Sequence, residues 1–430
     1  MLFVILCLSL SHKVFAADLF PQPINAVPLP VGSGARALGQ GGAFIAVADD
    51  ATAASWNPGG LTQLERPEFS IVGSFLLTRQ DFDNNAQYSF DDQTVSRGDL
   101  NYASFVYPFK IFGKNLVTSL NYQQVYDFHN NLGYKAHYNG TQQSNTYDAT
   151  YDVNFESKGG IGALTPAIAM QVLPKLSFGV SVNVYTDEFF GNYAWKQVEK
   201  GFGNVTINKG TSGEHTYSDN YVHKDTFKNF QAANVTIGML WDVWEKDDKC
   251  LNFGAVFKTP FEANVDRKPS EGSRIHYEID YPMSFGMGLC FRYNDALSMS
   301  TDATWTDWSE YITKDENGVK TRPFGRGISE DVNVDDTYTI RCGSEYLLFQ
   351  KSFIIPLRGG LFYEPRPSLN NPVDVYGVSV GSGITFQRFS LDAAYQFRWA
   401  TDGNGEDLGL SGSHFGLEEH LFLASVIVYF

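Results

Sequence analysis

The stretch Arg388-Phe-Ser-Leu-Asp-Ala-Ala-Tyr-Gln-Phe-Arg-Trp399 decides the fold of this chain. Every second residue from Phe389 to Trp399 is apolar, and the residues between them are small, polar or charged. A period of two is typical of a strand with one apolar and one polar face. The connection before this strand, 386–388, is hardly longer than a turn, whereas the connection after it, 401–416, is long, acidic and rich in glycine. Short turns that alternate with long loops indicate a transmembrane β-barrel whose apolar face contacts lipid.

The same alternation recurs along the chain and predicts an all-β fold, an antiparallel barrel of about fourteen strands. The predicted strands are Glu68–Arg79, Asp99–Phe109, Asn115–Tyr126, Gly160–Leu173, Leu176–Thr186, Asn229–Trp244, Lys249–Pro260, Met283–Tyr293, Leu297–Trp308, Thr337–Phe349, Phe353–Tyr363, Val373–Phe386, Arg388–Trp399 and Leu417–Phe430. An even number places both termini on the short-turn side, which is the periplasm. The aromatic residue Phe430 at the end of the last strand resembles the signal that the outer-membrane insertion machinery reads.

The composition agrees with such a barrel and limits the alternatives. Aromatic residues make up 15% of the 430 residues and charged residues only 19%, as aromatic girdles would produce. Beyond the N-terminus no run approaches the roughly 20 apolar residues of a spanning helix, so an inner-membrane protein is not expected. The formal charge of −16 argues against nucleic acid as a partner, because phosphate binding requires patches of Lys and Arg.

The chain begins with a predicted signal peptide, residues 1–16. Leu2–Leu10 is almost wholly apolar, and the following Val14-Phe15-Ala16 fits a cleavage site for signal peptidase. The alternative is a buried N-terminal strand. The cysteines that would remain after cleavage are Cys250, Cys290 and Cys342. Because their number is odd and each falls inside a predicted strand, we expect isolated thiols rather than a disulfide framework or a metal site.

Residues 17–67 differ in character from the predicted barrel segment 68–430. They contain many glycines and prolines, namely Gly32, Gly34, Gly39, Gly41, Gly42, Gly59, Gly60, Pro21, Pro23, Pro28, Pro30 and Pro58. They show neither an extended period of two nor a long amphipathic stripe, so we expect a compact plug in the lumen, the hatch. The alternative is a disordered leader, against which the Ala-rich, weakly charged stretch Gly39–Leu61 argues.

A series of motifs in the hatch resembles a known family. The motifs are Gly32-Ser-Gly-Ala-Arg-Ala-Leu-Gly39, Gly41-Gly-Ala-Phe44, Ala48-Asp-Asp-Ala-Thr52 and Trp56-Asn-Pro-Gly-Gly-Leu61. They resemble the N-terminal hatch of the FadL-like family of outer-membrane transporters for long-chain fatty acids, toluene and other hydrophobic compounds. The motif residues carried over from this resemblance are Gly34, Arg36, Asp49, Asp50, Asn57 and Pro58. In one departure, the Asn-Pro-Ala of the family reads Asn-Pro-Gly here.

The resemblance implies passive transport of hydrophobic small molecules in the cell outer membrane through a hatch-plugged barrel, with no enzyme activity, cofactor or metal. It implies that ligand is gathered by extracellular loops, passes to a pocket in the lumen and leaves sideways at a kink in the third strand. The predicted third strand, Asn115–Tyr126, contains neither Gly nor Pro and therefore does not indicate a kink. The expected surroundings are outer-membrane lipid and lipopolysaccharide around a monomer that the barrel-insertion machinery has assembled.

The longest predicted loop, Asp187–Lys228, contains a cluster of aromatic residues. These are Phe189, Phe190, Tyr193, Trp195 and Phe202. Apolar residues exposed outside the membrane suggest capture of a hydrophobic ligand. The alternative is that they pack the loop onto the barrel rim, because a long loop needs a core of its own. Phe20 is a further candidate, because the resemblance implies an N-terminus that reaches into the ligand pocket. The alternative is a mobile tail.

Charged residues fall at lumen-facing positions of neighbouring strands. Arg341 and Glu345 share one strand, Arg358 lies on the next and Asp302 on the preceding one. Charges that faced lipid at mid-membrane would cost about 2–4 kcal/mol each, so these side chains are expected to face inward. Arg341 or Arg358 could bind a ligand carboxylate through the guanidinium fork. The alternative is an Arg–Glu/Asp ladder that ties the hatch to the wall.

Two other functions remain open from the sequence. Barrels with similar hatch motifs serve as shuttles in a protein secretion system, so this chain could instead bind secreted proteins. Gly377-Val-Ser-Val-Gly381 matches the nucleophile elbow of serine hydrolases, which would make Ser379 the nucleophile of an outer-membrane lipase. That motif requires a sharp strand-to-helix turn, whereas here it lies inside a predicted strand.

Overall fold

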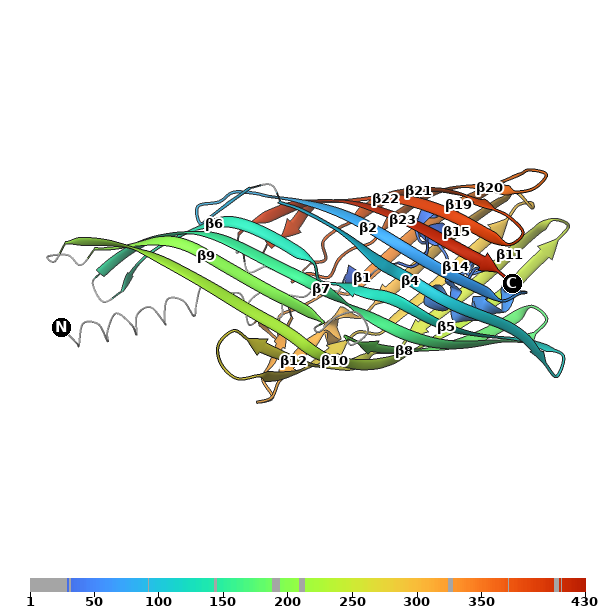
Figure 1. The fold of residues 1–430 in the computed structure, drawn as a ribbon, viewed down its shortest axis with the longest axis horizontal. Helices are drawn as coiled ribbons and strands as arrows, with labels where there is room; N and C mark the ends of the chain where they lie inside the picture. The colour runs from blue at the N-terminus through green and yellow to red at the C-terminus, as the bar shows by residue number, and fades with distance from the viewer. Residues whose placement is uncertain are drawn as a thin grey trace.

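The computed structural model describes residues 29–30, 32–91, 93–142, 145–187, 194–208, 213–323, 328–369, 371–405, 410 and 412–430 (Figure 1). The predicted signal peptide, residues 1–16, lies outside the described residues, as do Phe20, Phe189, Phe190 and Tyr193.

Fourteen antiparallel strands form a closed barrel, as the sequence predicts. They are β2 (Glu68–Phe82), β4 (Gln93–Ile111), β5 (Lys114–Asp127), β7 (Asn145–Leu173), β8 (Leu176–Thr186), β10 (Glu214–Lys246), β11 (Lys249–Lys258), β14 (Ser284–Arg292), β15 (Leu297–Thr306), β19 (Thr337–Phe349), β20 (Ile354–Tyr363), β21 (Tyr376–Thr385), β22 (Phe389–Asn404) and β23 (His414–Tyr429). The barrel closes where β23 pairs with β2 in unbroken register from Glu68–Tyr429 to Phe82–Phe415.

The barrel wall has two chemically different faces. On β23, Leu421, Leu423 and Ser425 are buried toward the lumen, whereas Phe422 and Val426 are exposed on the outside. The alternation along β22 matches, with Asp392 and Gln396 among the buried residues. An exposed apolar outer face is stable only against lipid, so the barrel is built for the outer membrane.

The prediction that residues 187–228 form a loop is wrong for the described residues. β9 (Trp195–Asn208) and the first half of β10 form a long antiparallel hairpin that also pairs with β7. β7 has 29 residues and β10 has 33, far more than the 9–11 residues that cross a bilayer. Both strands therefore continue beyond the barrel, as the left part of Figure 1 shows. A register shift between Lys228 and Gln231, with Asn229 at φ 57°, interrupts the period of two and explains why the sequence suggests a strand start there.

The other strands also belong to this outer part, except for β1. They are β3 (Tyr88–Phe90), β6 (Asn130–Gln142), β12 (Phe261–Pro269), β13 (Ile275–Tyr281), β16 (Ile312–Asp315), β17 (Lys320–Arg322) and β18 (Ile328–Ser329), together with the 3₁₀ turn η3 (Trp308–Glu310). They connect the ends of the barrel strands that lie opposite the short turns. β1 (Leu29–Pro30) comes before the barrel and pairs with the end of β5.

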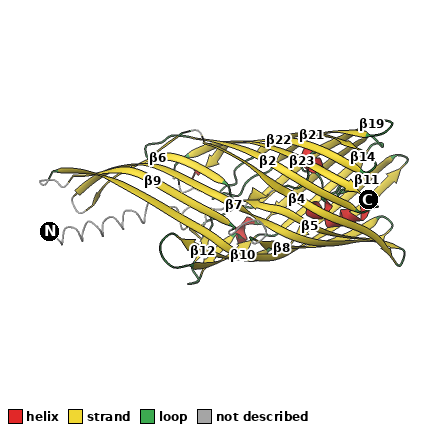
Figure 2. Cartoon of the chain, viewed as in Figure 1, coloured by secondary structure: helices red, strands yellow, loops and turns green. Residues whose placement is uncertain are grey.

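Three short helices in the described part of the chain pack against the inner face of the barrel wall (Figure 2). They are α2 (Ala35–Gly39), α3 (Ala53–Trp56) and the 3₁₀ helix η1 (Pro58–Gln63). Their small residues, among them Ala37, Ala53 and Ala54, are buried against the lumen face of the wall. No helix in the described part of the chain is long and apolar enough to cross a membrane.

Candidate ligand-binding site

Residues 32–64, the inner segment, form the floor of the lumen and are bound to the wall by backbone contacts. Asp302 of β15 accepts hydrogen bonds from the backbone N–H groups of Phe44 (2.6 Å) and Ile45 (2.8 Å). The Asn57 side chain donates to the carbonyl of Met239 on β10 at 2.9 Å. The Ser379 hydroxyl accepts from Gly41 N–H at 2.8 Å and donates to the Gly39 carbonyl at 3.0 Å. These buried groups satisfy backbone donors and acceptors that helices this short leave unpaired.

Glycines in the wall allow this close approach. A Cβ atom on Gly179 would lie 2.3 Å from the backbone of Pro58, and one on Gly360 would lie 2.2 Å from Gly41 N. Any other residue would push the inner segment away from the wall. The motif residues Asn57 and Pro58 therefore face wall positions where only glycine fits.

A chain of buried charges adds to these contacts. Arg36 of the inner segment pairs with Asp49 (2.8 Å) and with Glu345 of β19 (2.9 Å). Glu345 also pairs with Arg358 of β20 at 2.6 Å, and Arg358 pairs with Asp392 of β22 at 2.5 Å. The Arg358 side chain is only 3% exposed and has no free face for a ligand. The contacts of Arg358 are those of an ionic ladder between inner segment and wall.

Asp50 and Gly34 have structural contacts of their own. Asp50 accepts from the Thr52 backbone at 2.8 Å and from the Thr52 hydroxyl at 2.6 Å. Gly34 adopts φ 86°, a backbone conformation that favours glycine, and its N–H donates to Asn101 of β4 at 3.3 Å. Both residues shape the inner segment and neither lines a cavity that would explain a direct role in binding.

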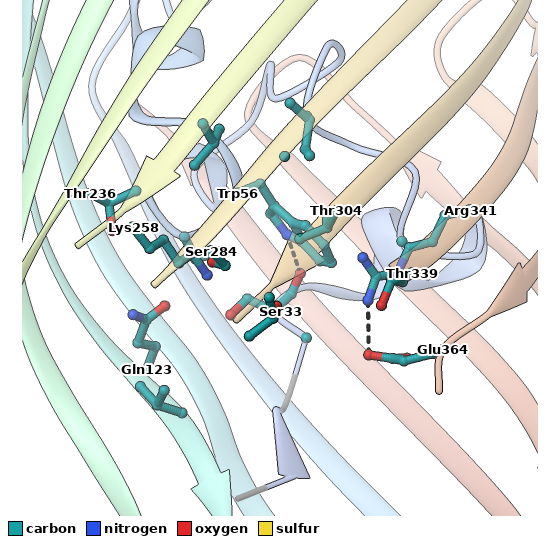
Figure 3. A pocket seen from close by; sticks show the side chains of 18 of the residues that line it. Ser33, Trp56, Gln123, Thr236, Lys258, Ser284, Thr304, Thr339, Arg341 and Glu364 are labelled. Carbon is teal, nitrogen blue, oxygen red and sulfur yellow. Dashed lines mark hydrogen bonds and ion pairs between the residues drawn. The ribbon is translucent and has the colours of Figure 1, made fainter. Parts of the chain in front are cut away.

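Above the inner segment lies a cavity of about 230 Å³ (Figure 3). Its apolar lining includes Trp56, Tyr185, Phe261, Trp308 and Phe362. Its polar lining includes Gln123, Asn183, Asn234, Thr236, Ser284, Thr304, Thr339 and Gln396. A mixed lining of this kind suits a molecule with an apolar body and a polar end.

Four charged residues line the same cavity, and three of them are cations. Arg341 pairs with Glu364 at 2.8 Å, and Arg398 lies 3.8 Å from the same carboxylate. Lys258, at the end of β11, faces the cavity beside Thr236 and Ser284 (Figure 3). Among the described residues no hydrogen bond or ion pair involves the Lys258 ammonium. Lys258 was not predicted from the sequence. It follows the buried residues Gly254 and Val256 at the spacing of two residues that places all three on the lumen face of β11.

Aromatic residues pack together on the outer side of the cavity, and we call this cluster the roof. Trp195 stacks on Phe227 (ring centroids 4.2 Å apart) and contacts Phe128 at 4.8 Å. Phe261, which lines the cavity, stacks on Tyr281 at 4.6 Å. Trp195 is thus buried among aromatic residues, whereas Phe202 on the same hairpin is 70% exposed. The structure places these two sequence-predicted residues on opposite faces of β9.

The wall beside the cavity is interrupted between β4 and β5, and we call this interruption the seam. The two strands pair from Ile111–Lys114 to Tyr102–Gln123, after which the pairing stops. β4 continues to Gln93 with β2 as its only barrel partner, and β5 continues with a register shift at Val125 against β7. Gln123, Val125 and Tyr126 of β5 line the cavity. The third strand therefore changes its path at a bulge, for which neither Gly nor Pro is required.

The fold and the cavity define a class of protein, an outer-membrane barrel with a cavity in its lumen. A profile of the family described as outer membrane protein transport protein (OMPP1/FadL/TodX) matches residues 29–413. This chain belongs to that family. It has no match among curated protein sequences.

Solved structures of similar fold support this assignment. A Pseudomonas aeruginosa FadL homologue superposes with a TM-score of 0.60 at 15% identity, covering 94% of this chain and 100% of that chain. The Pseudomonas putida toluene transporter TodX gives a TM-score of 0.53 at 12% identity, with coverage of 94% and 100%. The Ralstonia pickettii toluene transporter TbuX gives 0.52 at 14% identity, with coverage of 93% and 98%. At these identities the likeness concerns the fold.

Proposed function

We propose that this protein passively transports hydrophobic small molecules across the outer membrane by way of the lumen cavity. The observation that carries this proposal is a partly apolar cavity enclosed between the inner segment and the roof, in a member of an outer-membrane transport family. In this proposal the inner segment and the roof restrict the two ends of the cavity, so that it holds a ligand without forming an open aqueous pore. The secretion-partner alternative is not favoured, because it offers no reason for this cavity.

In this proposal residues 17–67 act as the hatch that blocks the periplasmic end of the lumen. The hydrogen bonds to Asp302 and Ser379 and the ionic ladder through Glu345 support this role. Ser379 is 4% exposed, and its hydroxyl forms hydrogen bonds with the backbone of Gly41 and Gly39. We therefore assign Ser379 an anchoring role and no catalytic one.

We further propose that ligand leaves sideways through the seam. The seam lies beside the cavity, and Gly73 and Phe75 of β2, opposite the unpaired part of β4, are exposed on the lipid face. A molecule that left the cavity there would enter the bilayer directly. Such a route avoids both the hatch and the periplasmic water, in which a hydrophobic ligand is poorly soluble.

We propose that the preferred ligand carries an acidic head on an apolar chain. Lys258 has no partner among the described residues, and the lining holds three cations but one carboxylate, Glu364. Lys258 faces the cavity as an exposed side chain, and an anionic head group of a ligand could pair with its ammonium by a charge-assisted hydrogen bond. The relatives named as toluene transporters carry a hydrocarbon without a charge, so this ligand class would distinguish the present chain from them.

Uptake of oleate and of oleyl alcohol, which share the chain and differ in the head group, tests both proposals. Cells without other such barrels would receive wild type, Lys258→Gln or the control Lys175→Gln in a periplasmic turn. We expect Lys258→Gln to reduce oleate uptake at limiting concentration by about tenfold and to leave oleyl alcohol uptake unchanged. Equal effects on both ligands would refute the head-group assignment. Uptake of neither ligand above an empty-vector strain would refute the transport function itself.

The oligomeric state of the barrel and its contacts in the outer membrane are part of this proposal. We propose that the barrel is a monomer in contact with outer-membrane lipid and lipopolysaccharide, and that the insertion machinery recognises the strand ending at Phe430. The Phe430 ring is 70% exposed, and its backbone N–H donates to the Pro67 carbonyl at 3.0 Å, so the aromatic side chain is presented at the barrel end. Removal of Phe430 should lower the amount of barrel in the outer membrane.

A further inference from the structure

Along one stretch of the wall, β4 and β5 share no backbone ladder with each other, although β1 pairs with the end of β5 there. Above Tyr102, β4 has no pairing with β5, although Asp127 at the end of β5 still pairs with Gly160 of β7. Arg97 lies on the unpaired stretch, where its backbone is opposite Leu76 of β2. Arg97 and Asp127 therefore belong to the two edges of the seam.

These two residues meet across the seam. A guanidinium nitrogen of Arg97, Nη1, forms an ion pair with the Asp127 carboxylate. The two side chains are 12% and 5% exposed, so little solvent screens the pair. Arg97 Nε lies 3.6 Å from Asp99 on its own strand, a weaker contact that does not cross the seam.

His129 completes the contact from the β5 side. Its Nδ1 lies 2.7 Å from Arg97 Nη1, and its backbone N–H donates to Asp127 Oδ1 at 3.0 Å. Burial and the neighbouring Arg97 charge lower the pKa of His129 to about 4, so the ring is uncharged at neutral pH. The attraction across the seam is thus between one cation and one anion, with a neutral ring beside them.

Separating β2 from β4 would cost much more free energy than separating β4 from β5 at the seam. The junction of β2 and β4 continues rung by rung to Gln80–Gln93, and separating it would break a series of backbone hydrogen bonds. Each unsatisfied backbone group is costly in lipid, so fully paired junctions stay closed. At the seam, the Arg97–Asp127 pair joins β4 directly to β5, while the β5 edge also pairs with the two residues of β1 and Asn101 of β4 bonds the inner segment.

We propose that Arg97 and Asp127 form a latch across the seam, and that its opening controls how fast ligand passes from the cavity into the outer leaflet. This inference rests on the proposed lateral exit. The latch adds a control point: while the pair is closed, the edge of β4 stays next to β5, and when it opens the two edges can separate without breaking the barrel ladder.

Charge reversal tests the latch. Arg97→Glu would place a carboxylate against Asp127, and we expect the initial rate of oleate transfer from purified protein to lipid vesicles to rise about fivefold. The double variant Arg97→Glu/Asp127→Arg restores an opposite-charge pair and should return the rate toward wild type. A matched control is Arg79→Glu, which reverses an exposed arginine on β2, on the side of β4 opposite to β5.

A cross-link provides the opposite perturbation. In a background with Cys250, Cys290 and Cys342 changed to Ser, Arg97→Cys/Asp127→Cys would be joined by a short thiol cross-linker. We expect transfer to fall at least tenfold and the heat-modifiable migration of the folded barrel to stay unchanged, which separates a locked seam from misfolding.

The possible outcomes separate this inference from the proposed function. If wild type transfers oleate but neither charge reversal nor the cross-link alters the rate, the latch is refuted. If Arg97→Glu accelerates transfer and the double variant does not restore it, the effect is not that of a pair and the latch is likewise refuted. If wild type transfers no more oleate than protein-free vesicles, the transport function fails before the latch is tested.

Discussion

The inner segment below the cavity and the roof above it are held together by different kinds of side-chain contact. The inner segment is held by directional contacts, such as the hydrogen bonds of Asp302 and the ion pairs of Glu345. The roof is held by stacked rings, of which Trp195 and Phe227 are the most closely spaced. Directional contacts fix one arrangement, whereas apolar contacts tolerate repacking. We infer that the floor is a permanent closure and that the roof is the side that can rearrange for an entering ligand.

The largest expected effect comes from removing the floor. Deletion of residues 17–64 should leave a barrel that inserts but conducts small ions, because it removes the segment that fills the lumen below the cavity together with its contacts to the wall. Single-channel conductance in planar bilayers measures this directly. An unchanged low conductance would show that the roof closes the lumen alone. The roof, and not the floor, would then be the permanent closure.

A single substitution in the ionic ladder should weaken the floor without removing it. Glu345→Gln leaves Arg36 and Arg358 without a shared carboxylate and is expected to destabilise the protein by about 3–5 kcal/mol. The urea midpoint of folding into lipid vesicles measures the loss. The control Glu278→Gln breaks an exposed pair with Lys314 and should move the midpoint little. Equal shifts for both variants would mean that the ladder does not hold the floor.

The roof should respond to loss of a ring in another way. Trp195→Ala removes the centre of the stack at a cost of about 3 kcal/mol, and we expect faster ligand entry with no rise in ion conductance. The control Phe202→Ala changes an exposed ring on the opposite face of the same strand and should leave both properties unchanged. Ion leakage through Trp195→Ala would show that the roof, and not the floor, is the principal closure.

The smallest effect concerns an ionic contact next to the roof. Burial opposes ionisation of Asp225, but hydrogen bonds from His223 (2.7 Å) and Arg267 (2.7 Å) outweigh it, so the pKa of this carboxyl lies below its usual value. A depressed pKa contributes stability above the unfolded value of about 3.9 and loses it as the pH falls through the folded value. Tryptophan fluorescence below about pH 4 should therefore change in wild type and remain constant in Asp225→Asn. Identical acid profiles would show that this contact does not support the roof.

Much of the fold could be predicted from local patterns. All fourteen barrel strands were recognisable because lipid outside and a filled lumen inside impose a period of two on every strand. The period fails at Asn229, where a bulge shifts the parity, so the outer half of β10 looked like a loop. Trp195 and Phe202 looked equivalent in the sequence, and only the pairing of β9 with β7 and β10 assigns them to a core and to an exposed face.

The sequence by itself determined the barrel, the lumen-facing charges and the family motifs of the inner segment, since each depends on residue type and spacing within one short stretch. The tertiary structure decided which charges pair: Arg358 with Glu345 and Asp392, and Arg341 with Glu364, while Lys258 has no partner among the described residues. It also decided where β4 and β5 separate and that Arg97 meets Asp127 there. These outcomes depend on the register between strands and on the distance across a closed barrel, and residues far apart in the chain do not encode such distances locally.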